Sequence, residues 1–394
     1  MYGPPMNATT KQRTARRVYE PEHEEFRASF RRFLESTVIP NYPQWEADGV
    51  VPRSVFTEAG AHGFLGTAID EEFGGGGVDD FRFNAVIAEE VAVAGVMSFG
   101  INLHNDICIP YFLRYADAEQ RRRWLPGLAS GELIAAIAMT EPGTGSDLAG
   151  ITTTATRDGD HFVLNGAKTF ISNGINADVV IVAARTDAAG DRHSGLSLLV
   201  VERDTPGFSR GRNLDKIGMH AQDTAELFFD DARVPAANLL GELGGGFKAL
   251  VSNLQQERLT IAVASAAAAA RAVELASEYV TERKAFGKPL SANQNTRFTL
   301  ADCHVQSEVV RTFVDDCLRE HSRGELSADR AAMAKLAATE TQGVVVDKCL
   351  QMFGGYGYMA EFPISRAYVD ARVQRIYGGT SEIMKEIIGK SMGI

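Results

Sequence analysis

The stretch His161-Phe-Val-Leu-Asn-Gly-Ala-Lys-Thr-Phe-Ile171 lies near the middle of the chain and separates the candidate fold classes. Two short β-prone runs flank Asn165-Gly166, the dipeptide that most strongly predicts a hairpin turn. Further strands are predicted at Asp178–Arg185, Gly195–Arg203 and Glu226–Val234. Consecutive strands with no helix between them predict an antiparallel sheet or small barrel over residues 134–243, and not a βαβ fold.

Helical periodicity appears on both sides of this β-rich segment. Before it, apolar residues at three- and four-residue spacing predict helices at Glu20–Val38, Arg53–Ala61, Phe81–Ala94 and Ala118–Gly127. After it, a long helix is expected from about Phe247 to Arg283, with eight alanines between residues 262 and 272. We therefore expect an α+β protein with an N-terminal helical domain (1–133), a β-barrel domain (134–243) and a C-terminal helical bundle (244–394).

Composition narrows the class of protein. The 394 residues are 45% hydrophobic, enough for a large core, and the net charge of −11 argues against binding nucleic acid or an anionic membrane. No uninterrupted apolar run approaches the roughly 20 residues of a membrane span. The segment Met1–Arg17 is polar and basic and lacks the apolar core of a secretory signal. We expect a soluble cytoplasmic enzyme.

Several familiar motifs are incomplete or absent in this sequence. Met139–Leu148 has the first two glycines of a dinucleotide fingerprint, but Leu148 occupies the third position. Gly166–Thr169 resembles the end of a phosphate-binding loop, yet Ala167 replaces its last glycine. The four cysteines form no close pair and the eight histidines have no metal-ligand spacing, so no metal site is predicted.

Three Gly-rich loops are candidates for ligand binding. Thr140–Asp147 combines glycine N–H groups with hydroxyl donors and could hold a flat polar ring or a phosphate, although it could also be an ordinary turn. Thr380 is a good helix N-cap behind Gly378-Gly379, and Gln351–Gly357 is a second Gly/aromatic turn. Either of the last two could instead be a corner between helices.

Glu257 interrupts the apolar stripe of the long helix. It follows Leu254 by three residues and precedes Ile261 by four, where an apolar residue is expected. Burial raises the pKa of a carboxyl group and makes it a competent base near neutral pH. A residue at the edge of the stripe, or a buried Glu paired with an Arg, is the alternative.

Five motifs together resemble acyl-CoA dehydrogenases, in the family's order and over about residues 20–390. They are Met139–Asp147, Lys168–Gly174, Glu282–Gly287 with Gln294, Gln351–Gly355 and Tyr377–Glu382. The resemblance implies a helical domain, a β-barrel domain and a C-terminal four-helix bundle. It also implies FAD as cofactor, an acyl-CoA substrate, an electron-transferring flavoprotein as electron acceptor, and a homotetramer.

The resemblance also implies which residues bind FAD. Thr140, Gly145, Ser146, Phe170 and Ser172 would lie on the isoalloxazine side, with Phe170 and Ser172 where Trp and Thr are usual in the family. The diphosphate and adenine of a neighbouring subunit's FAD would be held by Arg283, Phe286, Gln294, Gln351, Gly354 and Gly355. Thr380 and Glu382 would complete the site.

One position departs from the family pattern in a way that matters for catalysis. Many members have Tyr-Glu-Gly-Thr where this chain has Tyr377-Gly378-Gly379-Thr380, and that Glu is their base. Long-chain and isovaleryl members carry the base on the long helix instead, in a Glu-Arg-Leu context that matches Glu257-Arg258-Leu259 here. The resemblance therefore implies Glu257 as the catalytic base.

The expected reaction is FAD-dependent α,β-dehydrogenation of an acyl-CoA, medium- to long-chain, to trans-2-enoyl-CoA in fatty-acid β-oxidation. Ser146, Arg258, Gly378 and Gly379 are the expected substrate-binding residues, with a backbone N–H near Gly378–Gly379 as donor to the developing enolate oxygen. Three alternatives stay open: a branched short-chain dehydrogenase, a non-catalytic relative, and an oxidase or flavin monooxygenase on the same fold.

Overall fold

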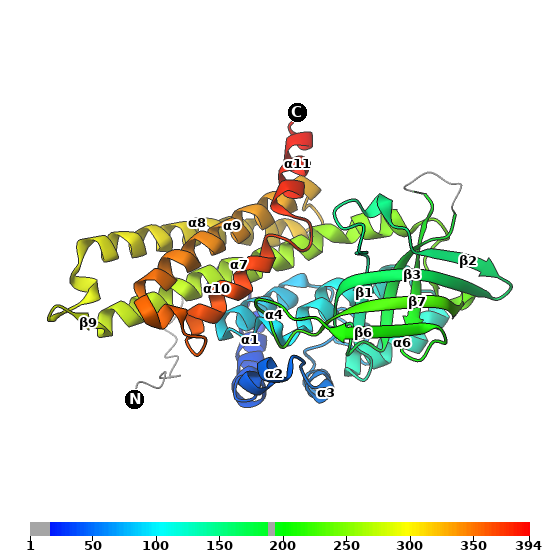
Figure 1. The fold of residues 1–394 in the computed structure, drawn as a ribbon, viewed down its shortest axis with the longest axis horizontal. Coiled ribbons are helices and arrows are strands. Elements are labelled where there is room, and N and C mark those ends of the chain that lie inside the picture. Colours follow the sequence, from blue (N-terminus) through cyan, green and yellow to red (C-terminus); the bar gives the residue numbers. More distant parts are fainter. Residues whose placement is uncertain (1–15, 188–193) are drawn as a thin grey trace.

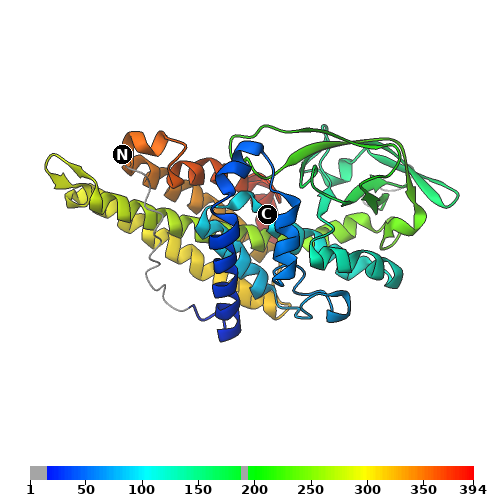
Figure 2. The ribbon, with the colours of Figure 1, turned by 90° about the horizontal axis from the view of Figure 1, so that it is seen from below.

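The computed structural model describes residues 16–187 and 194–394, so most of the basic segment Met1–Arg17 lies outside the described residues. Long C-terminal helices run along the longest axis, a sheet lies at one end of them, and shorter N-terminal helices cross their middle (Figures 1 and 2). The expected order of helices, sheet and helices is thus observed.

The N-terminal helices begin and end at clear local signals. Asp80 caps the helix that starts at Phe81 by accepting from the Arg82 N–H, and Gly95 ends it with a left-handed φ of 70°. The helices of this region, including two short ones that periodicity did not reveal, are α1 (Pro21–Phe33), α2 (Tyr42–Asp48), α3 (Arg53–Ala61), α4 (Phe81–Ala94), α5 (Ile109–Tyr115) and α6 (Ala118–Ser130). Two π-helical segments, η1 (Leu34–Val38) and η4 (Leu103–Cys108), lead into the loop before α2 and directly into α5.

The central sheet is mixed, which corrects the expectation of an antiparallel barrel. Its strands are β1 (Ala135–Ala138), β2 (Thr154–Asp158), β3 (His161–Ser172), β4 (Val179–Arg185), β5 (Leu196–Glu202), β6 (Phe208–Asn213), β7 (Thr224–Pro235) and β8 (Leu239–Leu240). They pair in the order β6-β7-β3-β2-β4-β5-β8, and β1 pairs with β4. Both β1 and β2 run parallel to β4, so the sheet contains parallel pairs between sequence-distant strands.

The hairpin predicted at Asn165-Gly166 is wrong. Strand β3 continues through this dipeptide with a bulge between Leu164 and Gly166, and the turn lies earlier, where Asp158 pairs with His161 around Gly159. Gly166 serves close packing instead of a turn, because a Cβ there would lie 2.6 Å from the Thr153 hydroxyl oxygen.

The C-terminal region consists of packed helices with a small hairpin at its far end. Its elements are α7 (Gly246–Glu282), β9 (Lys284–Ala285), β10 (Lys288–Pro289), α8 (Gln294–Ser322), α9 (Ala328–Met352), α10 (Pro363–Gln374) and α11 (Ser381–Ser391). By length and composition alone α7 could cross a membrane, yet 72% of its most apolar window is buried inside the protein. Such burial is typical of a core helix, and α7 packs against α4, α8 and α9.

One buried apolar cluster positions the start of α7 against the sheet and α5. It contains Tyr111 of α5, Ile181 of β4, Leu198 of β5 and Leu250 of α7. Since a close-packed cluster of this kind fixes side-chain positions, it brings α5 to within hydrogen-bonding reach of the polar residues of α7.

Candidate active site

Glu257 is buried on α7, and two side-chain hydrogen bonds from the described residues end on one of its carboxylate oxygens. The Tyr111 hydroxyl donates to Oε1 over 3.1 Å and the Asn253 amide donates to the same oxygen over 3.0 Å. Within residues 16–187 and 194–394, no donor contacts Oε2. Burial raises the pKa of Glu257, and the two hydrogen bonds together with Arg258 and Arg114 oppose this rise.

Asn253 connects the carboxylate to α5 and to the π-helical segment before it. Its amide oxygen accepts from Arg114 over 3.1 Å, and its amide nitrogen also donates to the Ile107 carbonyl over 3.2 Å. Sequence reasoning missed both Asn253 and Tyr111. Asn253 precedes Glu257 by one helical turn, so spacing could have revealed it, whereas Tyr111 is 146 residues away and gave no local signal.

Gly378 and Gly379 lie against α7 one turn beyond Glu257. A Cβ at position 378 would lie 2.5 Å from the Ile261 Cδ1, and both glycines have positive φ, 63° and 97°. A side chain at 378 is therefore excluded by packing and by backbone conformation. In the part of the chain that the structure describes, the N–H groups of Gly378 and Gly379 donate to no acceptor, so they are available to a ligand.

Two buried cations flank this glycine pair. Lys335 of α9 donates to the Gly379 carbonyl over 2.5 Å, and burial with a contribution from Arg258 lowers the pKa of Lys335 to about 8. Arg258 is 5% exposed and its Nε has no hydrogen-bond partner among the described residues. Burial lowers the pKa of Arg258, while Glu257 raises it. The structure thus brings four of the predicted residues, Glu257, Arg258, Gly378 and Gly379, into one region.

The loop after β1 lies beside β3, and the two segments carry residues predicted for one half of the cofactor site. The Thr169 N–H donates to the Thr140 carbonyl over 2.9 Å, which places the loop next to Phe170 and Ser172. Gly145 and Ser146 are exposed on this loop, and Phe170 is 68% exposed with a positive φ of 60°. An exposed aromatic ring in a strained conformation is a feature that a bound ligand would explain.

A buried ion pair holds that loop in place. Lys168 of β3 donates to Glu141 over 2.9 Å and to the Met139 carbonyl over 3.1 Å, so it contacts both neighbours of Thr140. Burial alone would raise the pKa of Glu141, but hydrogen bonds from Lys168, Thr152 and Thr153 bring it to about 2. Burial lowers the pKa of Lys168 to about 8 against the effect of Glu141.

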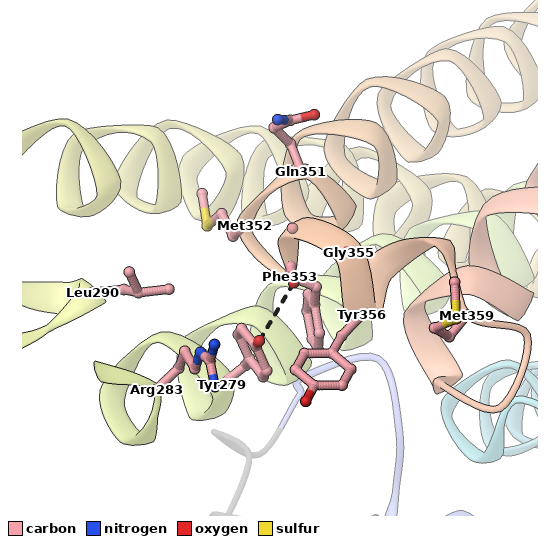
Figure 3. A pocket seen from close by; sticks show the side chains of 10 residues that line it. Tyr279, Arg283, Leu290, Gln351, Met352, Phe353, Gly355, Tyr356 and Met359 are labelled. Atoms are coloured by element: carbon pink, nitrogen blue, oxygen red, sulfur yellow. Dashed lines mark hydrogen bonds between the residues drawn. The ribbon is translucent and has the colours of Figure 1, made fainter. Parts of the chain in front are cut away.

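A second group of predicted cofactor residues lines a cavity of about 570 Å³ at the far end of the helices. Figure 3 shows Arg283 from the end of α7 and Gln351 from the end of α9 at this cavity, with the stacked rings of Tyr279 and Phe353 between them. The lining residues are Tyr279, Arg283, Leu290, Gln351, Met352, Phe353, Gly354, Gly355, Tyr356 and Met359. Gln294 is exposed at the start of α8, and Phe286 is fully exposed at the tip of the β9–β10 hairpin.

One chain does not bring the two groups of predicted cofactor residues together. The hairpin of β9 and the strand β3 lie at opposite ends of the molecule in both ribbon views. Thr380 caps α11 through the Ile383 N–H, and Glu382 is exposed in the first turn of that helix.

Comparison with known proteins identifies the family over most of the chain. The N-terminal, middle and C-terminal domains of acyl-CoA dehydrogenase match residues 20–132, 136–232 and 244–393. The chain belongs to the acyl-CoA dehydrogenase family. The long-chain specific acyl-CoA dehydrogenase of Sus scrofa is 47% identical over 96% of this chain and 88% of its own. The enzyme is thus an oxidoreductase acting on CH–CH bonds.

Other relatives are named for other substrates. Isobutyryl-CoA dehydrogenase of Dictyostelium discoideum is 37% identical, and short-chain specific acyl-CoA dehydrogenase of Rattus norvegicus is 35% identical. They cover 94% and 93% of this chain, and each alignment spans 89% of the relative. The family is therefore established, whereas the acyl chain length is not fixed by these names.

Solved structures support the same fold. An acyl-CoA dehydrogenase from Geobacillus kaustophilus matches with a TM-score of 0.95 and 50% identity, over 96% of this chain and 100% of that chain. A glutaryl-CoA dehydrogenase from Mycobacterium smegmatis in complex with FADH2 matches with a TM-score of 0.88 and 30% identity, over 95% of both chains. A chain from a structure of the electron transferring flavoprotein of Acidaminococcus fermentans matches with a TM-score of 0.89 and 31% identity. The match covers 95% of this chain and 98% of that chain.

Members of the family are FAD-dependent, and the residues of this enzyme fit that cofactor. A Cβ on Gly354 or Gly355 would meet no atom within 4 Å, so these glycines border open space beside Arg283 and not packed protein. An open Gly-Gly turn next to an arginine suits a diphosphate group. At the other end, the exposed ring of Phe170 and the hydroxyl donors of the Thr140 loop suit the edge and face of a flavin ring.

Proposed function

We propose that this acyl-CoA dehydrogenase converts acyl-CoA thioesters to trans-2-enoyl-CoA with Glu257 as the catalytic base. The observation that carries the proposal is the position of Glu257: it is a buried carboxylate with a raised pKa, one helical turn before Ile261, the residue against which Gly378 packs. The N–H groups of Gly378 and Gly379 donate to no acceptor among the described residues. These are the two elements that removal of an α-proton beside a thioester requires, a base and donors for the oxygen that becomes negative.

The chain's own residues divide the work of the reaction. Glu257 accepts the α-proton as the α–β double bond forms. The N–H of Gly378 or Gly379 donates to the thioester oxygen, and Lys335 fixes this segment through the Gly379 carbonyl. When bound, FAD supplies the acceptor for the hydride that leaves the β-carbon. Arg258 and Ser146 are proposed to bind the substrate.

The proposed cofactor-binding residues are divided between two subunits. We propose that Thr140, Gly145, Ser146, Phe170, Ser172, Thr380 and Glu382 hold FAD in one subunit. Its diphosphate and adenine would then be held by the neighbour's Arg283, Phe286, Gln294, Gln351, Gly354 and Gly355. The separation of the two groups within one chain supports this assignment. The division into domains at 1–133, 134–243 and 244–394 stays a proposal on the same footing.

We further propose a homotetramer, supported by apolar side chains that α8 leaves in solvent. Val305 and Val309 are 59% and 64% exposed and lie one helical turn apart, and Phe298 is 60% exposed. Replacing Val305 and Val309 by arginine is expected to give a smaller oligomer, because two buried unpaired charges disfavour an interface. Light scattering after gel filtration measures this. An unchanged mass would show that this face is not an interface.

Medium- to long-chain acyl-CoA substrates are the proposed specificity, supported by the 47% identity to the long-chain relative. Anaerobic bleaching of the flavin by a panel of acyl-CoAs from C4 to C18 tests this, and we expect the highest kcat/KM at C8 or longer. A maximum with isobutyryl-CoA or another short branched acyl-CoA would instead favour the branched short-chain alternative. Rapid oxygen consumption during turnover would indicate an oxidase.

The metabolic role of the enzyme and its electron acceptor are part of the same proposal. A role in fatty-acid β-oxidation and electron transfer to an electron-transferring flavoprotein are proposed, and reduction of that acceptor by the substrate-reduced enzyme tests the second. A cytoplasmic location stays a prediction. The long-chain relative of Sus scrofa is mitochondrial by its name.

A further inference from the structure

The carboxylate of Glu257 is held asymmetrically. Two donors from different elements, the Tyr111 hydroxyl of α5 and the Asn253 amide of α7, converge on Oε1 at 3.1 and 3.0 Å. Asn253 is itself fixed by three contacts, to Glu257, to Arg114 and to the Ile107 carbonyl. A carboxylate with one oxygen fastened in this way has a defined rotation, and the second oxygen has a defined direction.

Other titratable and charged groups near the same carboxylate come from η4, α5 and α7. Cys108 at the end of η4 interacts with Glu257, and burial raises the pKa of its thiol, so it stays neutral. Arg114 of α5 and Arg258 of α7 are the nearby cations that favour the ionised carboxylate. Burial, together with Glu257, also keeps Tyr111 protonated by raising its pKa, so its hydroxyl is a donor throughout the working range of pH.

We propose that Tyr111 and Asn253 are positioning residues for the base: they hold Oε1 and leave Oε2 as the oxygen that accepts the substrate's α-proton. This inference rests on the proposed role of Glu257. Because both donors bond to the ionised form, they also counteract burial and keep the base ionised at lower pH than burial alone would allow. Tyr111 packs in the apolar cluster as well, so its ring and its hydroxyl have separable roles.

Tyr111→Phe isolates the hydroxyl, since the ring and its packing remain. We expect the acid limb of the pH profile for anaerobic flavin reduction by acyl-CoA to move to higher pH by about one unit. On the acid side of the limb the rate then falls about tenfold, with KM unchanged. A purely structural role of Tyr111 would lower the rate equally at all pH values.

A second measurement does not depend on turnover. The infrared C=O band of the protonated Glu257 carboxyl, assigned by its loss in Glu257→Gln, titrates in the substrate-free holoenzyme. Its midpoint should move up by about one pH unit in Tyr111→Phe, and in the same direction in Asn253→Ala. Tyr115→Phe is the matched control, because the Tyr115 hydroxyl bonds to Ser252 at the surface and not to Glu257.

The outcomes separate this inference from the proposed function. In a folded, flavin-containing Tyr111→Phe enzyme, the acid limb of the pH profile and the infrared titration each have a midpoint. If both midpoints stay in place while Glu257→Gln is inactive, the positioning role is wrong and the base assignment stands. If no acyl-CoA bleaches the wild-type flavin, the proposed function fails, and the infrared titration still decides whether the two donors act on Glu257. A shift of both midpoints supports the positioning role.

Discussion

Glu257→Gln should lower the rate of flavin reduction by acyl-CoA about 10,000-fold while leaving the yellow holoenzyme intact. An amide cannot accept the α-proton, and loss of a general base costs rates of up to this order. No other carboxylate can take over at Gly378, where a side chain would overlap Ile261. Tyr111 and Asn253 can still donate to the amide oxygen of the substituted side chain, so the packing around position 257 is preserved.

The measurement is stopped-flow bleaching of the flavin under anaerobic conditions. Glu278→Gln is the matched control, since it makes the same change on the same helix at a side chain that is 62% exposed. We expect FAD content and thermal stability of Glu257→Gln to equal or exceed those of the wild type, because a buried charge has been removed. A normal rate of bleaching in Glu257→Gln would show that the proton goes elsewhere.

Much of this site could be predicted from a single sequence because its signals are local. Glu257 was visible as a polar interruption in an apolar stripe, and the bounds predicted for Phe81–Ala94 coincide with α4 since Asp80 and Gly95 mark its ends. The resemblance to the family indicated that Gly378 stands where many members have their catalytic Glu, and no local signal gives this. Helices are built from contacts between near neighbours, so their pattern survives in the sequence.

The errors have the opposite origin, because they depend on contacts between distant segments. Asn165-Gly166 reads as a turn, yet Gly166 is needed where Thr153 approaches the strand. The parallel pairing of β1 with β4 joins residues 44 positions apart, such as Ala135 and Val179, so periodicity cannot reveal it. Tyr111 reaches Glu257 only because one apolar cluster joins α5, the sheet and α7. Sequence pattern therefore located Glu257 but not the residues that hold its carboxylate.

Lys168→Met should destabilise the enzyme and weaken FAD binding together. Lys168 is fully buried and is the cation that pairs with Glu141 in the described structure around the loop. Removing one partner leaves a buried carboxylate without its counter-charge, which costs about 3–5 kcal/mol of the free energy of unfolding. The same lysine fixes the Met139 carbonyl, so the Thr140 loop loses its anchor on β3 and flavin is released more readily on dilution.

The double variant Glu141→Gln/Lys168→Met separates the charge from the shape of the site. It carries no charge at either of the two positions, and we expect it to recover most of the stability lost in Lys168→Met. The pH dependence gives an independent check. Since the pKa of Glu141 is about 2 in the folded protein and ordinarily about 4.5, its contribution to stability is complete above about pH 4.5 and is lost as the pH falls toward 2. The double variant should lack this loss. If Lys168→Met is as stable as the wild type at pH 7, the pair does not hold the loop, and retention of FAD must depend on the loop's other contacts.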